Sequence, residues 1–137
     1  MLDTNACIVH NYIQEAWNGR NLDLVDAFLT VDCTVHNLPA HLPSGRAGAR
    51  ENLSRTLDTF PDLAVAIDDT VDQGDRVAVR LTFTGTHQGG FYGMPATGKS
   101  FSIAAIAVAR IADGMIAEWW QIGDTLGLLQ QIGAMPA

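Results

Sequence analysis

The fold is decided by the stretch Ile111-Ala-Asp-Gly-Met-Ile-Ala-Glu-Trp-Trp-Gln-Ile-Gly-Asp-Thr-Leu-Gly-Leu-Leu-Gln-Gln-Ile-Gly133. Its Ala112-Asp-Gly114 tripeptide predicts a tight hairpin turn, since residues of this type tolerate a positive φ. The residues from Met115 to Ile122 then predict the second strand of the hairpin. Asp124 precedes a leucine-rich segment and is a good start for a short helix. The stretch therefore predicts a β-hairpin followed by a closing helix.

Further strands are expected upstream of the hairpin. Apolar residues alternate with polar or small ones in 63–67, 77–83 and 101–111, the period of a strand with one buried face. The segment 87–98 is rich in glycine and proline and is expected to be an irregular connection. The C-terminal half thus predicts a run of long antiparallel strands.

The N-terminal half predicts helices. Apolar residues recur at helical spacing from about residue 4 to 18, from 22 to 29 and from about 46 to 59, where Pro61 ends the pattern. A short strand is expected at 33–36. This order predicts an α+β fold in which three N-terminal helices pack on one face of a strongly curved sheet. Such a cone encloses a hollow interior, and concave, mostly apolar sites commonly bind small molecules.

Composition limits the function. The 137 residues make one domain, residues 1–137, long enough to bury a core without metal or disulfides. A net charge of −7 argues against nucleic acid and anionic membranes as partners. No apolar run reaches the length of a membrane span. Cys7 and Cys33 are expected to be reduced thiols in a cytoplasmic protein, and no Cys/His spacing indicates a metal site.

Four segments carry a resemblance to a known family: 18–23 (NGRNLD), 74–80 (GDRVAVR), 84–98 (TGTHQGGFYGMPATG) and 110–118 (RIADGMIAE). In this order they resemble the SnoaL-like polyketide and ester cyclases of the NTF2-like superfamily. The resemblance implies the cone fold, a small apolar or aromatic ligand, a homodimer, and chemistry with no cofactor or metal.

The resemblance also implies an acid/base Asp on the last strand, helped by a His on the strand before it. Gln121 and Ala107 occupy those two positions here. An amide cannot exchange a proton near neutral pH, so Gln121 is expected to hold or polarise a carbonyl. His36 and Asp124 are the candidates for proton transfer. The alternatives are a hydrogen-bonded strand-end histidine and a helix N-cap, respectively.

The candidates for ligand binding are spread over the chain. Tyr12 and Trp17 lie on the first helix, and Asn37 falls where the related ketosteroid isomerases place a general-base Asp. Trp119 is expected to share a strand face with Gln121, whereas Trp120 points the other way. Ala107 would leave room for a ligand on the concave side, and the alternative is that it lets a helix pack closely against the sheet. His87 is expected to orient the glycine-rich connection.

Three hypotheses follow from these residues. The first is a cofactor-independent tailoring enzyme of the cyclase type that acts on a bulky, mostly apolar ester or polycycle. The second is a non-catalytic binding or accessory protein that kept the pocket. The third is another NTF2-like hydrolase or isomerase, of the epoxide hydrolase or ketosteroid isomerase type. Ile106 and Val108, on the opposite face of their strand from Ala107, are candidates for a dimer contact.

Overall fold

The computed structural model describes residues 4–91 and 93–136, and it confirms the predicted α+β architecture. A five-stranded sheet has the strand order β1-β5-β4-β3-β2, so the strand that comes first in the chain pairs with the last. That β1–β5 pair is parallel, and the other pairs are antiparallel. The strands are β1 Leu29–Val35, β2 Ala64–Gln73, β3 Arg76–Thr86, β4 Ser100–Ala112 and β5 Met115–Gly123. The helices are α1 Thr4–Asn11, η1 Tyr12–Asn18, α2 Asp23–Phe28, α3 Gly45–Thr59 and α4 Thr125–Gln131.

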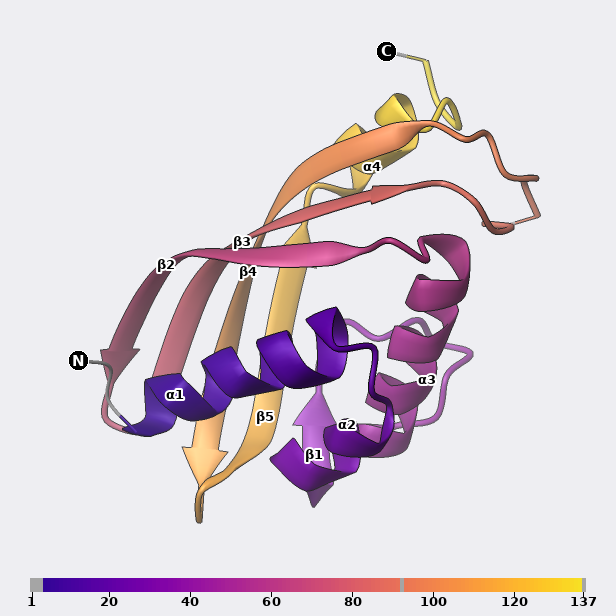
Figure 1. Ribbon diagram of the computed structural model, residues 1–137. Helices are drawn as coiled ribbons and strands as arrows, with labels where there is room; N and C mark the ends of the chain where they lie inside the picture. Colours follow the sequence, from indigo (N-terminus) through magenta and orange to yellow (C-terminus); the bar gives the residue numbers. More distant parts are fainter. Residues whose placement is uncertain (1–3, 92, 137) are drawn as a thin grey trace.

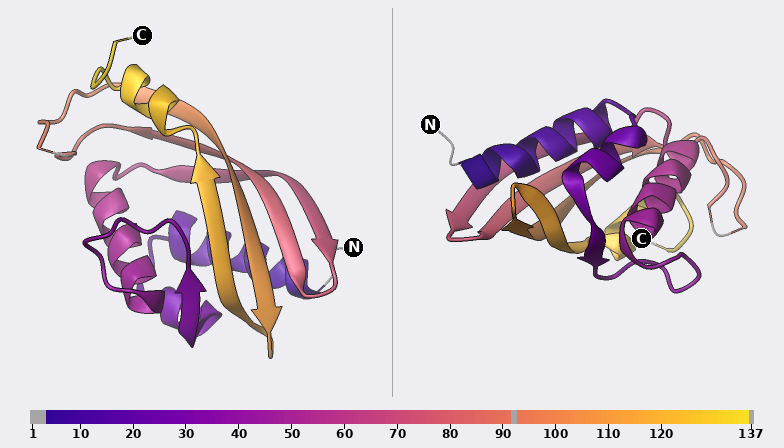
Figure 2. Two further views of the ribbon diagram at one scale, coloured as in Figure 1. Left: turned by 180° about the vertical axis from the view of Figure 1, so that it is seen from behind. Right: turned by 90° about the horizontal axis from the view of Figure 1, so that it is seen from below.

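The N-terminal helices through α3 all lie against one face of the curved sheet, as the front and rear views show (Figures 1 and 2). We call this the helix-covered face and its reverse the open face. Apolar side chains at alternate positions of β3 and β4 form the core against the helices: Val77, Val79, Leu81, Ala105, Ala107 and Ala109. The sheet is curved but not closed, because β1 and β2 form its two edges. No helix in the described part of the chain is long and apolar enough to cross a membrane.

The first helix differs from the expected regular α-helix. It changes at Tyr12 into a π-helix, η1, which runs to Asn18. In a π-helix the hydrogen bonds link residues five apart, so side chains at that spacing come to lie on the same side. Tyr12 and Trp17 are five residues apart, so both side chains point toward the interior, where they line a pocket.

The corner after this helix fastens it to the edge of the sheet. The side chain of Asn18 accepts from the Val65 backbone N–H at 2.8 Å and donates to the Val65 carbonyl at 2.9 Å. Arg20, with a φ of 54°, donates to the carbonyl oxygens of Pro61 and Leu63. These side chains therefore satisfy backbone groups at the edge of the sheet that no strand pairs with, and they tie the end of η1 to β2.

The predicted hairpin is confirmed. Asp113 and Gly114 have φ values of 53° and 75°, the combination that a two-residue turn between twisted strands requires. β4 and β5 pair from Ala112↔Met115 to Ala105↔Gly123, with one irregularity next to Ile111. This bulge comes before Trp119, so the residues beyond it alternate regularly between the two faces.

Candidate functional site

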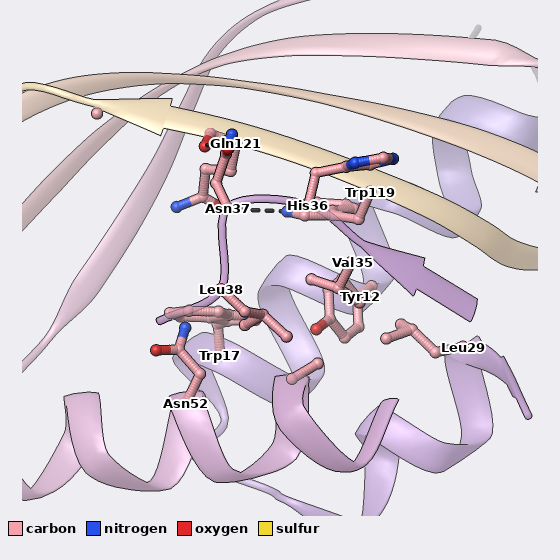
Figure 3. A pocket seen from close by; sticks show the side chains of 12 residues that line it. Tyr12, Trp17, Leu29, Val35, His36, Asn37, Leu38, Asn52, Trp119 and Gln121 are labelled. Carbon is pink, nitrogen blue, oxygen red and sulfur yellow. Dashed lines mark hydrogen bonds between the residues drawn. The ribbon is translucent and has the colours of Figure 1, made fainter. Parts of the chain in front are cut away.

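A cavity of about 110 Å³ lies between the helix-covered face and the helices, at the end of β1 (Figure 3). We call it the inner pocket. Aromatic and amide side chains contribute much of its wall, and they come from η1, α3, β5 and the segment that follows β1. Its lining residues are Tyr12, Trp17, Leu29, Val35, His36, Asn37, Leu38, Ala49, Asn52, Trp119, Gln121 and Gly123. Six residues singled out from the sequence are therefore brought together here: Tyr12, Trp17, His36, Asn37, Trp119 and Gln121.

The end of β1 positions the polar wall of the pocket. Val35 pairs with Trp119, and the His36 backbone N–H donates to the Trp119 carbonyl at 2.8 Å. At Asn37 the chain takes a φ of 64°, a conformation that Asn adopts more readily than most residues. The Asn37 amide then donates to the Gln121 carbonyl at 3.1 Å. The turn thus places Asn37 beside Gln121, although they are far apart in the chain.

Trp119 holds the side chain of Gln121 in a defined orientation. The indole Nε1–H of Trp119 donates to Gln121 Oε1 at 3.1 Å, the bond drawn in Figure 3. Because the amide oxygen accepts from the indole, the amide NH2 group is left to donate to a ligand. Ala107 lies directly across from Gln121 on β4 and is buried, but it is not part of the pocket wall. The position at which the resemblance implies an acid/base Asp is thus occupied by an oriented hydrogen-bond donor.

Tyr12 supplies a second donor. Its ring meets the Trp119 ring edge to face, with centroids 5.4 Å apart. Burial raises the pKa of the Tyr12 phenol to about 12, and a hydrogen bond with the Trp17 side chain acts in the opposite direction. The phenol therefore stays protonated throughout the physiological pH range, and its O–H can donate to an oxygen of a ligand.

The His36 imidazole is on the other side of the sheet. It stacks on Trp120 with centroids 4.8 Å apart and 4° between the ring planes, and its Nε2–H donates to Glu118 at 2.7 Å. Glu118 also accepts from Arg110 at 3.0 Å. Side chains alternate along a strand, so Glu118 and Trp120 point away from the face that carries Trp119 and Gln121. His36 therefore borders the pocket, but its ring does not reach the Gln121 amide, and the strand-end alternative describes its position.

Asp124 is also outside the pocket. Its Oδ1 accepts from the Gly127 backbone N–H at 2.9 Å, so that Asp124 is the N-cap of α4. The alternative reading of Asp124 as a cap, rather than as a proton-transfer group, therefore agrees with the geometry. A short Asp side chain at this position satisfies a free N–H of the first helical turn and turns toward its own helix.

His87 holds the connection between β3 and β4. Its side chain is fully buried, and its Nδ1 accepts from the Thr97 hydroxyl at 3.0 Å and the Thr97 backbone N–H at 3.2 Å. On the other side of the connection, the N–H groups of Gln88 and Gly89 donate to the Thr59 carbonyl at the end of α3. His87 thus has the loop-orienting position expected from the sequence.

Sequence reasoning missed Asn52, which comes from α3 and faces the pocket opposite β5 (Figure 3). Only the helical spacing could have indicated Asn52 from the sequence, because it lies one turn after Ala49, which also lines the pocket. None of the described residues hydrogen-bonds its side-chain amide, so both its donor and its acceptor are open to a ligand. No carboxylate or lysine occurs among the described residues that line the pocket, and no group of three or more His, Cys, Asp or Glu side chains in the described part of the chain is placed to hold a metal.

The inner pocket can therefore do three things chemically. Its aromatic rings can hold a flat apolar ligand, and its NH2 and O–H donors can stabilise negative charge on a carbonyl or enolate oxygen. Its described side chains do not offer a carboxylate base on the helix-covered face.

Comparison with known proteins gives a consistent family assignment. The sequence model of the SnoaL-like polyketide cyclases matches residues 8–132. Aklanonic acid methyl ester cyclase DnrD of Streptomyces peucetius is 40% identical over 62 residues, which are 45% of this chain and 43% of the relative. Aklanonic acid methyl ester cyclase DauD of Streptomyces sp. (strain C5) has the same identity over 62 residues, 38% of its length. The matched segments thus span less than half of either curated relative.

Solved structures match over nearly the whole chain. TsrD from Streptomyces laurentii superposes with a TM-score of 0.86 at 31% identity, covering 98% of this chain and 100% of that one. IdmH from Streptomyces antibioticus, for which a polyketide cyclase activity has been suggested, has a TM-score of 0.83 at 30% identity, with 96% and 99% of the two chains covered.

Proposed function

Because this chain belongs to the SnoaL-like polyketide cyclase family, we propose that the inner pocket is an active site for ring closure in a bulky, mostly apolar polyketide ester or polycycle, without a cofactor. The names of the partly matching relatives, aklanonic acid methyl ester cyclases, support a methyl ester as the substrate class. The observation that carries the proposal is the bond from Trp119 to Gln121, which occupies the amide oxygen and leaves the NH2 group of a pocket residue to donate to a ligand.

The proposed reaction is an intramolecular aldol addition. A C–H group next to a substrate carbonyl loses its proton to water. The electron pair of the broken C–H bond shifts toward the carbonyl oxygen, which gives an enolate. The NH2 group of Gln121 and the phenol of Tyr12 donate to the enolate oxygen and so lower its energy. The enolate carbon then forms the new C–C bond with a second carbonyl carbon, whose oxygen takes up a proton. Trp17 and Trp119 keep the two reacting parts of the substrate close together.

The test compares wild type with Gln121→Leu, which has nearly the same volume and no hydrogen-bonding group. An anthraquinone β-keto methyl ester serves as the substrate, with ring closure followed by chromatography and mass spectrometry, and binding followed by the fluorescence of the pocket tryptophans. We expect the variant to bind within a few-fold of wild type and to react roughly 100-fold more slowly, the effect typical of losing one oxyanion donor. Equal rates for the two proteins would overturn the role of Gln121.

The substitution Gln121→Asp gives the complementary result. It places a carboxylate at the position where the family resemblance implies the acid/base Asp. If the pocket still orients the substrate for ring closure, this carboxylate replaces water as the base and the rate rises. A variant that binds the ester but reacts more slowly than wild type would show that the amide donor, not a missing base, limits the reaction.

Non-catalytic binding is the second candidate, and one observation favours it. The His36 imidazole is held against Trp120 and Glu118 on the open face, away from Gln121. The assay above separates the two functions. A wild-type protein that binds the ester tightly and does not accelerate ring closure is a binding protein, whereas a catalytic protein shows turnover that depends on Gln121.

We also propose that the open face forms a homodimer. Ile106 and Ile122 are cross-strand partners there and are 56% and 72% exposed, and the neighbouring Val108–Trp120 pair extends the same apolar surface. A second copy of this face would cover these side chains. We expect light scattering to give twice the 14.7-kDa chain mass for wild type and a monomer for Ile122→Asp. Asn11→Asp, at an exposed residue at the end of α1 on the helix side of the sheet, adds the same negative charge as a control and should remain dimeric; a monomeric wild type would overturn the proposal.

We also propose that the protein is cytoplasmic. Both cysteines, Cys7 and Cys33, are free thiols in the structure, which agrees with a reducing compartment.

A further inference from the structure

The inner pocket is too small for the ligand class that the proposed function requires. Its volume of about 110 Å³ is close to that of a cavity that holds a single benzene ring. Sites for drug-sized ligands typically have about 300–1,000 Å³. A bulky ester or polycycle must therefore extend beyond the inner pocket, and the structure shows where it can go.

A second cavity, of about 390 Å³, lies between the C-terminal half of α3, the segment after β1, and the connection between β3 and β4. We call it the outer pocket. Asn52 lines both cavities, and Leu38 in the inner pocket is followed directly by Pro39 in the outer one. The two cavities thus adjoin each other along one wall of α3 and one turn of the chain.

The wall along α3 is continuous because of helical spacing. Ala49 and Asn52 line the inner pocket, and Asn52, Thr56 and Thr59 line the outer one. Residues three or four apart lie on one side of a helix, so these side chains form a single strip that leads from one cavity to the other. Asn52 stands at the junction, with its side-chain amide unused by the described residues.

The chemistry of the outer pocket selects an uncharged group. The rings of Phe60 and Phe91 lie in its wall with their centroids 5.9 Å apart. The guanidinium of Arg55 is already paired with Glu51 at 2.8 Å, and Asp58 adds another negative charge at the rim. Among the described residues that line this pocket, an anionic group therefore finds no unpaired guanidinium or ammonium group, whereas an apolar chain or ring finds two aromatic faces.

We propose that the outer pocket is a second compartment of the binding site, which takes an uncharged, apolar tail or second ring of an extended ligand whose leading ring occupies the inner pocket. This inference rests on the proposed function for the identity of the leading ring. The ligand passes Asn52, whose amide hydrogen-bonds a carbonyl or ester group at the junction, and its tail lies against Phe60 and Phe91.

The test uses the methyl, butyl and hexyl esters of benzoic acid, whose single ring matches the inner pocket, and binding is measured by calorimetry on the intact protein. The methyl ester reports on the inner pocket, and the longer chains report on the outer one. For wild type we expect the affinity to rise about three- to fourfold for each methylene that is buried. Thr56→Phe places a ring in the outer pocket one turn from Asn52, where it blocks the path of the tail, and should remove this gain, while it leaves the methyl ester within about twofold.

Ser54→Phe is the matched control, because it adds the same ring to the same helix at a residue that lines neither cavity. It should leave the gain from chain length unchanged. Phe91→Ala serves as a second variant in case Thr56→Phe does not fold. It removes an aromatic face and should reduce the gain for the hexyl ester, with the methyl ester unaffected.

The outcomes separate this inference from the proposed function. A wild-type protein that binds the methyl ester but gains nothing from a longer chain overturns the second compartment alone. A gain that persists in Thr56→Phe and in Phe91→Ala overturns it as well. Failure to bind any of the esters overturns both the second compartment and the proposed ligand class, whereas an absence of ring closure with the chain-length gain intact overturns only the catalytic proposal.

Discussion

Gly89 lies where the β3–β4 connection touches the end of α3, and an alanine there should destabilise the protein strongly. A Cβ atom at Gly89 would lie 2.1 Å from the Asp58 carbonyl oxygen and 3.0 Å from the Thr59 Cα. Both of these atoms belong to the backbone, so no side-chain rotation relieves the contact. The connection must move away from α3 by about 1 Å to restore an ordinary contact distance.

That movement breaks the bonds that fasten the connection. The N–H groups of Gln88 and Gly89 each donate to the Thr59 carbonyl at 3.0 Å, and the Thr59 hydroxyl donates to the Gly90 carbonyl at 3.3 Å. At about 1 kcal/mol for each bond, Gly89→Ala should lower the free energy of unfolding by about 2–3 kcal/mol. For a chain of this size the loss corresponds to a fall in Tm of roughly 10 °C.

The neighbouring glycine gives a matched control. A Cβ at Gly90 would meet its nearest atom, the Met94 carbonyl oxygen, at an ordinary 3.8 Å, and neither glycine has a positive φ. Gly90→Ala should therefore be neutral or stabilise by up to about 1 kcal/mol, because alanine restricts the unfolded chain. Urea denaturation of both variants at equal m-values measures the difference. If Gly89→Ala lies within about 0.5 kcal/mol of Gly90→Ala, the close packing of the connection on α3 is refuted.

Two further predictions concern the rest of the fold. His36 and Arg110 donate hydrogen bonds to Glu118, in that order of influence, and hold the pKa of the Glu118 carboxyl below its usual range. A lowered native pKa adds stability above the unfolded-state pKa of about 4.3, and this contribution is lost as the pH falls through the native pKa. The stability difference between wild type and Glu118→Gln should therefore be present at pH 5 and shrink toward pH 3 in urea titrations. Asn18→Ala leaves the part-buried N–H and C=O of Val65 without their side-chain partner, and it should lower the free energy of unfolding by about 2–3 kcal/mol in the same assay.

Each of these predictions has a control variant on η1. Glu15→Gln removes a carboxylate from the exposed side of η1 and should leave the pH dependence of stability as in wild type. Gln14→Ala removes only the exposed bond from the Asn18 amide to Gln14 and should change the free energy of unfolding by less than about 0.5 kcal/mol. A Glu118→Gln curve parallel to wild type at all pH values, or an Asn18→Ala variant as stable as Gln14→Ala, would contradict the respective argument.

Local patterns predicted which residues share a face within one element. Trp119 and Gln121 are two apart on a strand, and both line the inner pocket. The turn at Asp113 and Gly114 and the strands on either side of it could be predicted because the required φ values depend on neighbouring residues alone. The helical part was less complete, because the switch from α1 to the π-helix η1 at Tyr12 leaves no mark in the apolar periodicity.

The candidate site depends on pairings between distant segments. Alternation along the strand predicts that His36 points opposite to Val35, but only the pairing of Val35 with Trp119 decides that Val35 is the one that faces the helices. Asp124 was a candidate for the pocket because it is close to Gln121 in the chain, yet its own helix takes up its carboxylate. Asn52 has no sequence signal stronger than its helical phase.

The sequence by itself determined the order of helices and strands, the C-terminal hairpin, the α+β class and the set of side chains available for chemistry, because each of these follows from periodicity and turn residues over a few positions. Only the tertiary structure decided that β1 pairs with β5, that the His36 ring lies on the open face, and that Asn52 lines both the inner and the outer pocket. The physical reason is that a side chain's direction is set locally relative to its own element, whereas the surroundings it meets are set by packing between elements whose residues are far apart in the chain.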